Sequence, residues 1–126
     1  MTPRILVATI AAATALGIGG AATAGAHTGA IGTSPKHGST VRVLPKAVAV
    51  TFGGPLARAG TARITRNGRG NFAGRATLSR RSAAKLIIPV KRPGSRALHR
   101  GRYRVVWRAV SPDGHTQRGV FAFRVR

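Results

Sequence analysis

The sequence has almost no acidic residues, no cysteine and a single methionine. Of its 126 residues, 22 are lysine or arginine and one is acidic, which gives a formal net charge of +21. One carboxylate excludes catalysis by paired carboxylates, and the lack of cysteine excludes disulfides, thiolate metal sites and a cysteine nucleophile. The methionine is Met1, so no thioether ligand occurs further along the chain. With 43% hydrophobic residues the chain is apolar enough to fold, and its length fits one domain.

Residues 1–26 have the layout of a secretory signal peptide. A basic start ending at Arg4 precedes an apolar stretch, and small residues follow up to Ala24-Gly25-Ala26. The apolar stretch is broken by glycines and is shorter than the roughly 20 residues of a membrane span, which disfavours an uncleaved anchor. We therefore expect cleavage after residue 26 and a mature domain over 27–126 that begins at His27. Loss of Arg4 alone lowers the formal charge to +20, and the protein is expected in the periplasm, at the cell envelope or outside the cell.

The remaining chain consists of short apolar runs between turn residues, without helical periodicity. In 102–109 and 118–126 apolar residues alternate with arginine, which is the period-two pattern of half-buried strands. About seven such segments predict an all-β fold, either a β-sandwich or a small Greek-key barrel. The other strands are predicted over 46–52, 61–66 and 83–90, with a weaker one over 72–78.

The inward faces of these strands supply the predicted core, while the arginine stems cover apolar surface and leave each guanidinium in water. The predicted core residues are Val48, Val50, Phe52, Ile64, Leu86, Ile88, Val105, Trp107, Phe121 and Phe123.

The only carboxylate, Asp113, lies in the turn Ser111-Pro112-Asp113-Gly114-His115. Taken alone, this turn favours a structural role, because aspartate and glycine are common turn formers. An N-terminal His27 favours a metal site over a purely structural turn, since its α-amine and its imidazole Nδ1 can chelate one metal ion. Together with a nitrogen of His115 and an oxygen of Asp113 they form a set that suits the tetragonal preference of Cu(II), although Zn(II) uses the same donors. The nitrogen donors must lose protons, so the affinity should fall in acid.

A series of short motifs runs through the chain from the start of the mature domain to its last strand. The motifs are His27, Ser34-Pro35 before Gly38, Leu44-Pro45, Val48-x-Val50-Thr51-Phe52, Gly101-x-Tyr103-x-Val105-x-Trp107, Ser111-x-Asp113-Gly114-His115 and Gly119-x-Phe121-x-Phe123. Taken in order, they resemble the CopC copper-resistance family over nearly the whole mature domain. The resemblance implies a cupredoxin-like or immunoglobulin-like Greek-key fold in an exported protein. It also implies Cu(II) binding through the N-terminal histidine and the Asp-Gly-His turn, here His27, Asp113 and His115.

The chain departs from the family pattern in three ways. It has no methionine-rich loop, so a Cu(I) site is not implied. Gly53-Gly54 stands where the family often has an acidic residue. The high positive charge opposes long-range capture of a cation, which predicts slower loading of the metal. Of the remaining histidines, His37 is left open as an extra ligand and His99 is expected in a turn.

Other partners and functions follow from the charge and from the N-terminal histidine. A domain with this charge attracts anionic envelope polymers, and we keep polymer binding as the alternative function. The aromatic residues face inward, so no specific nucleic-acid binding is expected. An N-terminal copper-binding histidine also resembles lytic polysaccharide monooxygenases, but a carboxylate on copper would occupy a position that oxygen chemistry needs. We expect a monomer that is no enzyme, and that sequesters Cu(II) or delivers it to a copper-transporting membrane protein.

Overall fold

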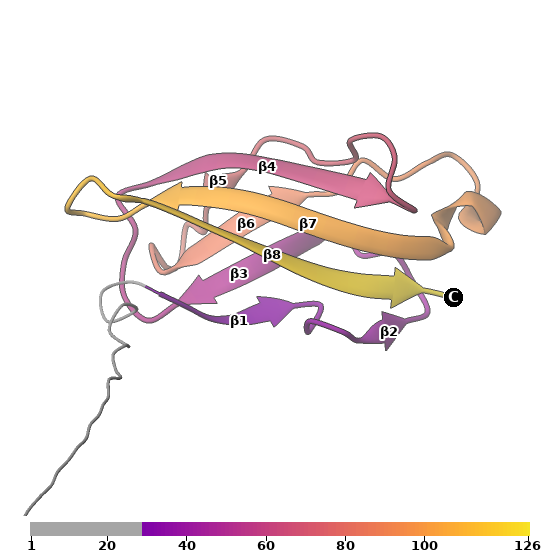
Figure 1. Ribbon diagram of the computed structural model, residues 1–126, viewed down its shortest axis with the longest axis horizontal. Coiled ribbons are helices and arrows are strands. Elements are labelled where there is room, and N and C mark those ends of the chain that lie inside the picture. The colour runs from indigo at the N-terminus through magenta and orange to yellow at the C-terminus, as the bar shows by residue number, and fades with distance from the viewer. Residues whose placement is uncertain (1–28) are drawn as a thin grey trace, which may run out of the picture.

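Alternating arginine and apolar residues build the two longest strands, which run side by side along the molecule (Figure 1). Strand β7 spans Gly101–Val110 and pairs antiparallel with β8, Thr116–Val125. Their aromatic residues and most of their aliphatic ones are buried and their arginines are exposed, as expected for strands with one face on a core; Val106 and Val120, which are cross-strand partners, lie on the exposed face. The computed structural model describes residues 29–126.

The strands form two four-stranded sheets packed as a sandwich. One sheet has the order β1-β3-β6-β5 and the other β2-β8-β7-β4, where β2 runs parallel to β8. A short 3-10 helix, η2 (Arg96–His99), precedes β7. The other strands are β1 (Ala30–Ser34), β2 (Thr40–Val41), β3 (Ala47–Phe52), β4 (Arg58–Arg66), β5 (Thr77–Leu78) and β6 (Lys85–Pro89).

The all-β prediction is confirmed, and every residue of the predicted core is buried. Aromatic rings join the sheets: Phe52 of β3 meets Trp107 of β7 edge to face, with ring centroids 5.2 Å apart. Within one sheet, the ring of Tyr103 in β7 stacks on the ring of Phe123 in β8, with centroids 5.3 Å apart. Leu44, Leu56 and other apolar residues of the connecting segments complete the core.

The weaker strand predicted over 72–78 is only partly correct. Only β5 is a strand there, and Ala73 forms an isolated bridge with Val90. The side-chain oxygen of Asn71 accepts hydrogen bonds from the backbone N–H groups of Ile64 (3.2 Å) and Ala73 (3.0 Å). The Asn71 side chain therefore satisfies backbone N–H groups that a longer strand would have paired with a neighbouring strand.

The start of β1 and the β7–β8 hairpin lie at the same end of the sandwich (Figure 1). The carbonyl of Gly29 accepts a hydrogen bond from the N–H of Gly53, just beyond β3, at 3.0 Å. The N–H of Ala57, in the following connection, donates to the carbonyl of Val110 at 2.7 Å. The hydrogen bond of Gly29 thus places the beginning of β1 at the hairpin end of the sandwich. Within residues 29–126 no helix is long and apolar enough to cross a membrane.

Candidate metal centre

The segment from Ser111 to His115 is a tight turn beyond the last pair of the β7–β8 ladder. The N–H of Ser111 donates to the carbonyl of His115, and the N–H of Gly114 donates to the carbonyl of Ser111, both at 2.9 Å. Gly114 has a φ of +89°, a left-handed conformation that glycine adopts without a steric penalty. The Pro-Asp-Gly sequence therefore fixes how Asp113 projects from the hairpin.

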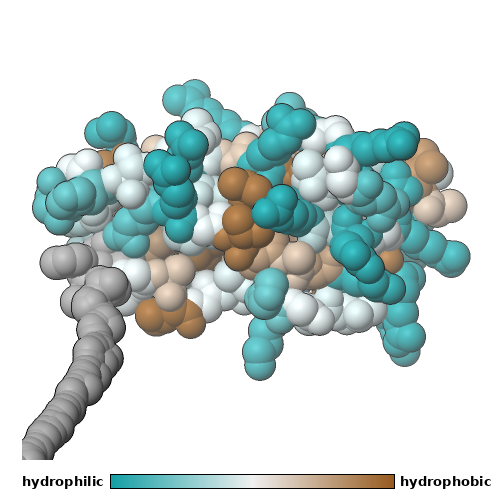
Figure 2. All heavy atoms as spheres, in the orientation of Figure 1, coloured by the Kyte–Doolittle hydropathy of each residue, from teal (hydrophilic) through white to brown (hydrophobic). Residues whose placement is uncertain are grey.

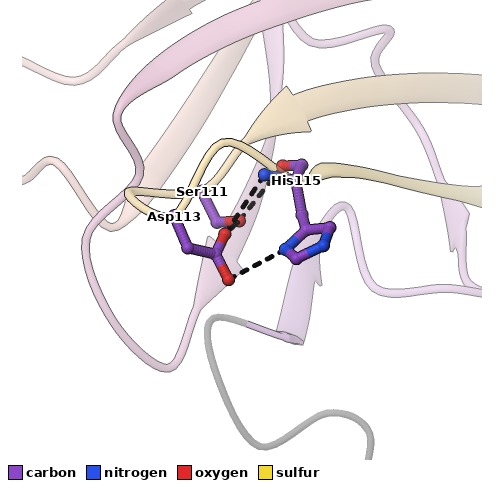
Figure 3. Close-up of polar contacts among 3 residues, drawn as sticks. All are labelled: Ser111, Asp113 and His115. Atoms are coloured by element: carbon purple, nitrogen blue, oxygen red, sulfur yellow. Dashed lines mark hydrogen bonds and ion pairs between the residues drawn. The ribbon is translucent and has the colours of Figure 1, made fainter.

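Both oxygens of the Asp113 carboxylate have partners within the turn (Figure 3). Oδ1 accepts the Ser111 hydroxyl at 2.7 Å and the N–H of His115 at 3.1 Å. Oδ2 lies 2.9 Å from Nδ1 of His115. The structure thus brings together the two described residues that the sequence assigned to the metal, and aligns an imidazole nitrogen with a carboxylate oxygen.

The turn has a buried anchor and an open outer side. Ser111 is 2% exposed, whereas the side chains of Asp113 and His115 are 46% and 82% exposed. The buried hydroxyl holds the carboxylate from below, while the imidazole remains accessible to an ion from solvent. Sequence reasoning included Ser111 in the motif but gave it no role, because its burial depends on how the hairpin folds back on the sandwich.

Hydrogen bonds keep Asp113 ionised. The Ser111 hydroxyl, and then the side chain and backbone N–H of His115, hold the pKa of this carboxyl well below its ordinary value. Because these bonds stabilise the charged form, the carboxylate is negative throughout the neutral range. It is the single negative side chain of the sequence.

His27, the third residue assigned to the metal, lies outside the described residues. Within residues 29–126 no group of three histidine, cysteine, aspartate or glutamate side chains gathers around a common point. The described part of the chain therefore contributes the Asp113–His115 pair alone.

The other two histidines lie far from this turn. Nδ1 of His37 accepts a hydrogen bond from the N–H of Ala122 at 3.1 Å. Ala122 is seven residues beyond His115 along β8, or roughly 24 Å at the usual rise of a strand. His99 belongs to η2, where its Nε2 lies 2.6 Å from the carbonyl of Pro93. The location of His37 argues against its use as an extra ligand.

These features define a class: a small β-sandwich domain with an exposed carboxylate–imidazole pair in the hairpin at one end. The chain belongs to the CopC family, because the model of the CopC domain matches residues 30–126. No match was found among curated proteins.

Two solved structures illustrate the likeness. CopC from Methylosinus trichosporium OB3b is 24% identical, with a TM-score of 0.65, and the match covers 79% of this chain and 93% of that one. PcoC from Escherichia coli, described as a methionine-rich copper resistance protein, is 26% identical with a TM-score of 0.64. That match covers 80% of this chain and 100% of PcoC. Unlike the methionine-rich PcoC, this chain has methionine only at position 1.

Proposed function

We propose that the protein is exported and binds Cu(II) through His27, Asp113 and His115, to sequester copper or pass it on. The observation that carries the proposal is the exposed pair of Asp113 and His115 at the end of the sandwich where the chain begins its first strand. Membership of the CopC family and the likeness to a copper resistance protein support copper as the metal.

The geometry of the pair fits two adjacent positions of a square-planar metal site. Nitrogen and oxygen ligands lie about 2.0–2.1 Å from a metal ion of this size, so two donors at right angles are roughly 2.9 Å apart. Nδ1 of His115 and Oδ2 of Asp113 are separated by 2.9 Å. A metal ion bound by both atoms would lie to one side of the line that joins them, so the imidazole would have to turn toward it while the separation of the two donors stayed nearly the same.

The second nitrogen of His115 offers an alternative contact. When Nδ1 donates its proton to Asp113, the lone pair of Nε2 is directed away from the carboxylate into solvent. Copper on Nε2 would leave Asp113 as the group that orients the imidazole, as carboxylates commonly do beside metal-bound histidines. Both arrangements depend on the same two residues, and the first also supplies the oxygen ligand.

The route of the chain supports a contribution from His27. It stands two residues before Gly29, whose carbonyl is fixed at the hairpin end of the sandwich. Two residues span at most about 7 Å, so the length of chain between them is compatible with a contribution from His27 at that end. Its amine and imidazole would complete a nitrogen-rich set that favours Cu(II), and the lack of methionine beyond residue 1 disfavours a thioether site for Cu(I).

The proposed role is binding without turnover. With Asp113 as a ligand, a carboxylate, two imidazoles and an amine fill the tetragonal plane of Cu(II), so that plane offers no open position for oxygen chemistry. The partners would be copper itself and a copper-transporting membrane protein that donates or accepts it. The proposed ligand set requires cleavage after Ala26, so that His27 carries the free amine. N-terminal sequencing of protein recovered outside the cytoplasm tests this: a first residue other than His27 would contradict the proposed ligand set.

The deciding experiment is electron paramagnetic resonance of Cu(II) bound to protein that begins at His27. A tetragonal, nitrogen-rich spectrum at one equivalent is expected, and one extra N-terminal glycine should change it markedly because the amine chelate is lost. The variants H115A and D113N should each weaken binding, whereas H37A should not, since His37 is held at the other end of β8. Identical spectra with and without the extra glycine, or no stoichiometric binding, would overturn the proposal.

A further inference from the structure

Arginines gather around three adjoining hollows at the end of the sandwich opposite the hairpin. The largest, of about 870 Å³, is lined by Arg100, Arg102, Arg124 and Arg126 among others. A second, of about 650 Å³, shares Arg100 and Arg126 with it, and a third, of about 330 Å³, shares Arg102 and Arg124. We name the exposed residues Arg42, Arg96, Arg100, Arg102, Arg124 and Arg126 the arginine track.

No carboxylate side chain of the protein is available to these cations. The single acidic residue, Asp113, is held in the distant hairpin by Ser111 and His115. Arg102 and Arg124 stand directly opposite each other in the β7–β8 register, an arrangement in which like charges repel. The charges of these two arginines therefore destabilise each other, and an external anion would relieve the repulsion. Figure 2 shows hydrophilic side chains projecting at many points of the visible face, among residues of intermediate and hydrophobic character.

The backbone beneath the largest hollow is fixed by side-chain hydrogen bonds. Asn67, with a φ of +51°, accepts the N–H of Arg102 on its side-chain oxygen at 2.9 Å and donates its own N–H to the carbonyl of Arg102 at 2.8 Å. Nε of Arg66 donates to the carbonyl of Arg100 at 2.8 Å. The positions from which the track arginines project are thus set in the free protein, which lowers the entropic cost of binding.

The chemistry of the track points to phosphate. Seventeen arginines and four lysines occur in the described residues, and the planar guanidinium group matches phosphate oxygens in a bidentate manner that lysine does not. Hollows that share arginines suit several phosphates on one thin chain, whereas a flat bilayer would touch only their rims. We propose that the arginine track binds a linear phosphate polymer, with successive phosphates held in neighbouring hollows.

The track is electrostatically separate from the Asp113–His115 turn. The Arg102–Arg124 pair lies eight register steps from the last pair before the hairpin, which is roughly 27 Å along the strands. The screening length at physiological salt is about 8 Å. Polymer binding and copper binding should therefore be independent, so either proposal stands if the other fails.

The test is fluorescence anisotropy of labelled inorganic polyphosphate with the mature chain and with the double variant R102Q/R124Q. The control, R80Q/R81Q, removes the same charge from the β5–β6 connection, next to a segment that bonds to Phe52 at the hairpin end. The track variant should bind about tenfold more weakly at physiological salt, with the salt slope reduced by about two. The control should change the affinity much less, and the Cu(II) spectrum of the track variant should be unchanged.

Three results would overturn the proposal. Equal losses in the track and control variants would mean that only net charge matters. Equally tight binding of polyglutamate would remove the preference for phosphate. Tighter binding to phosphatidylglycerol vesicles than to polyphosphate would assign the surface to a membrane instead. If R102Q/R124Q does not fold, R100Q/R126Q replaces it, because these two arginines lie in two of the hollows and Arg126 is outside the ladder.

Discussion

The indole ring of Trp107 covers Gly119, its cross-strand partner in the β7–β8 ladder. A Cβ atom at Gly119 would lie 2.4 Å from Cζ2 of the ring and 2.8 Å from Cε2. The same ring meets Phe52 of the other sheet edge to face, so it is held from both sides. A side chain at position 119 must displace an aromatic residue that joins the two sheets.

The substitution G119A is therefore expected to lower the free energy of unfolding by about 1–3 kcal/mol, the usual cost of overpacking a core. G94A is the matched control, because a Cβ atom at Gly94 meets nothing within 4 Å, and its effect should stay within about 0.5 kcal/mol. Denaturant unfolding followed by fluorescence of the only tryptophan measures both. Equal stabilities of the two variants would show that the indole moves aside without cost.

Tyr103 should make the protein less stable at alkaline pH. It is fully buried and donates its hydroxyl proton to the carbonyl of His99 at 2.7 Å. Burial raises the pKa of Tyr103, and the nearby charge of Arg66 offsets this only in part. Because the folded pKa exceeds the unfolded value of about 10, the stabilisation is complete below that pH and is lost as the pH rises through the folded pKa.

The tyrosinate absorbance of this single tyrosine should accordingly titrate at higher pH in the folded chain than in denaturant. The variant Y103F should lose about 1 kcal/mol at neutral pH, since a carbonyl loses its donor, and should be less sensitive to pH above 10 than the parent. Coincident titration curves of folded and unfolded protein would contradict this account.

The strands that the sequence revealed are those with one buried face and strong alternation. Val48, Val50 and Phe52 in β3 mark such a strand through their spacing alone. Strands β1 and β2 were not predicted, because they lie at sheet edges and bury little: Ile31 of β1 is 71% exposed, and β2 has two residues. Edge strands are defined by their neighbour's hydrogen bonds and leave no clear pattern of hydropathy.

The part of the candidate site that could be predicted is the part whose residues are close together in the sequence. Asp113 and His115 stand two residues apart in one turn, and the structure places their side chains in contact. Their relation to the first strand depends on pairing between β1 and β3, residues far apart along the chain. The anchoring by Ser111 likewise depends on burial of its hydroxyl, which no local pattern indicates.

The variant S111A should weaken Cu(II) binding although Ser111 is no ligand. Its hydroxyl holds Oδ1 of Asp113 at 2.7 Å and is the first cause of the low pKa of that carboxyl. Without it the carboxylate is less well oriented and easier to protonate. Loss of a group that orients a ligand typically costs about tenfold to a hundredfold in affinity. Competition titrations against a Cu(II) chelator measure the change.

The pH dependence separates this positioning role from a general loss of structure. Copper release by S111A should begin at a higher pH than release by the parent, because protons displace a more weakly bound metal ion from the nitrogen donors at a lower proton concentration. S82A serves as the control, since Ser82 also bonds locally, to the N–H of Ala84, but lies in the β5–β6 connection. Unchanged affinity and an unchanged release pH in S111A would rule out the positioning role.

Two arginines near the hairpin should slow the capture of copper. Arg108 and Arg118 face each other across the ladder, and Arg118 stands three residues beyond His115, or roughly 10 Å along the strand. This distance is comparable with the screening length of about 10 Å at 0.1 M salt, so both repel an approaching divalent cation. The variant R108Q/R118Q should bind Cu(II) roughly twofold to fivefold faster at that salt concentration. Stopped-flow quenching of Trp107 fluorescence measures the rate.

The double variant R102Q/R124Q removes the same charge at the far end of the strands and provides the control. Its association rate should match that of the parent at 0.1 M salt, because roughly 27 Å separates it from the hairpin. At 1 M salt the screening length is about 3 Å, and the advantage of R108Q/R118Q should vanish. Equal acceleration by both variants would show that net charge slows loading, whereas no acceleration by either would show that these arginines leave the approach of copper unaffected.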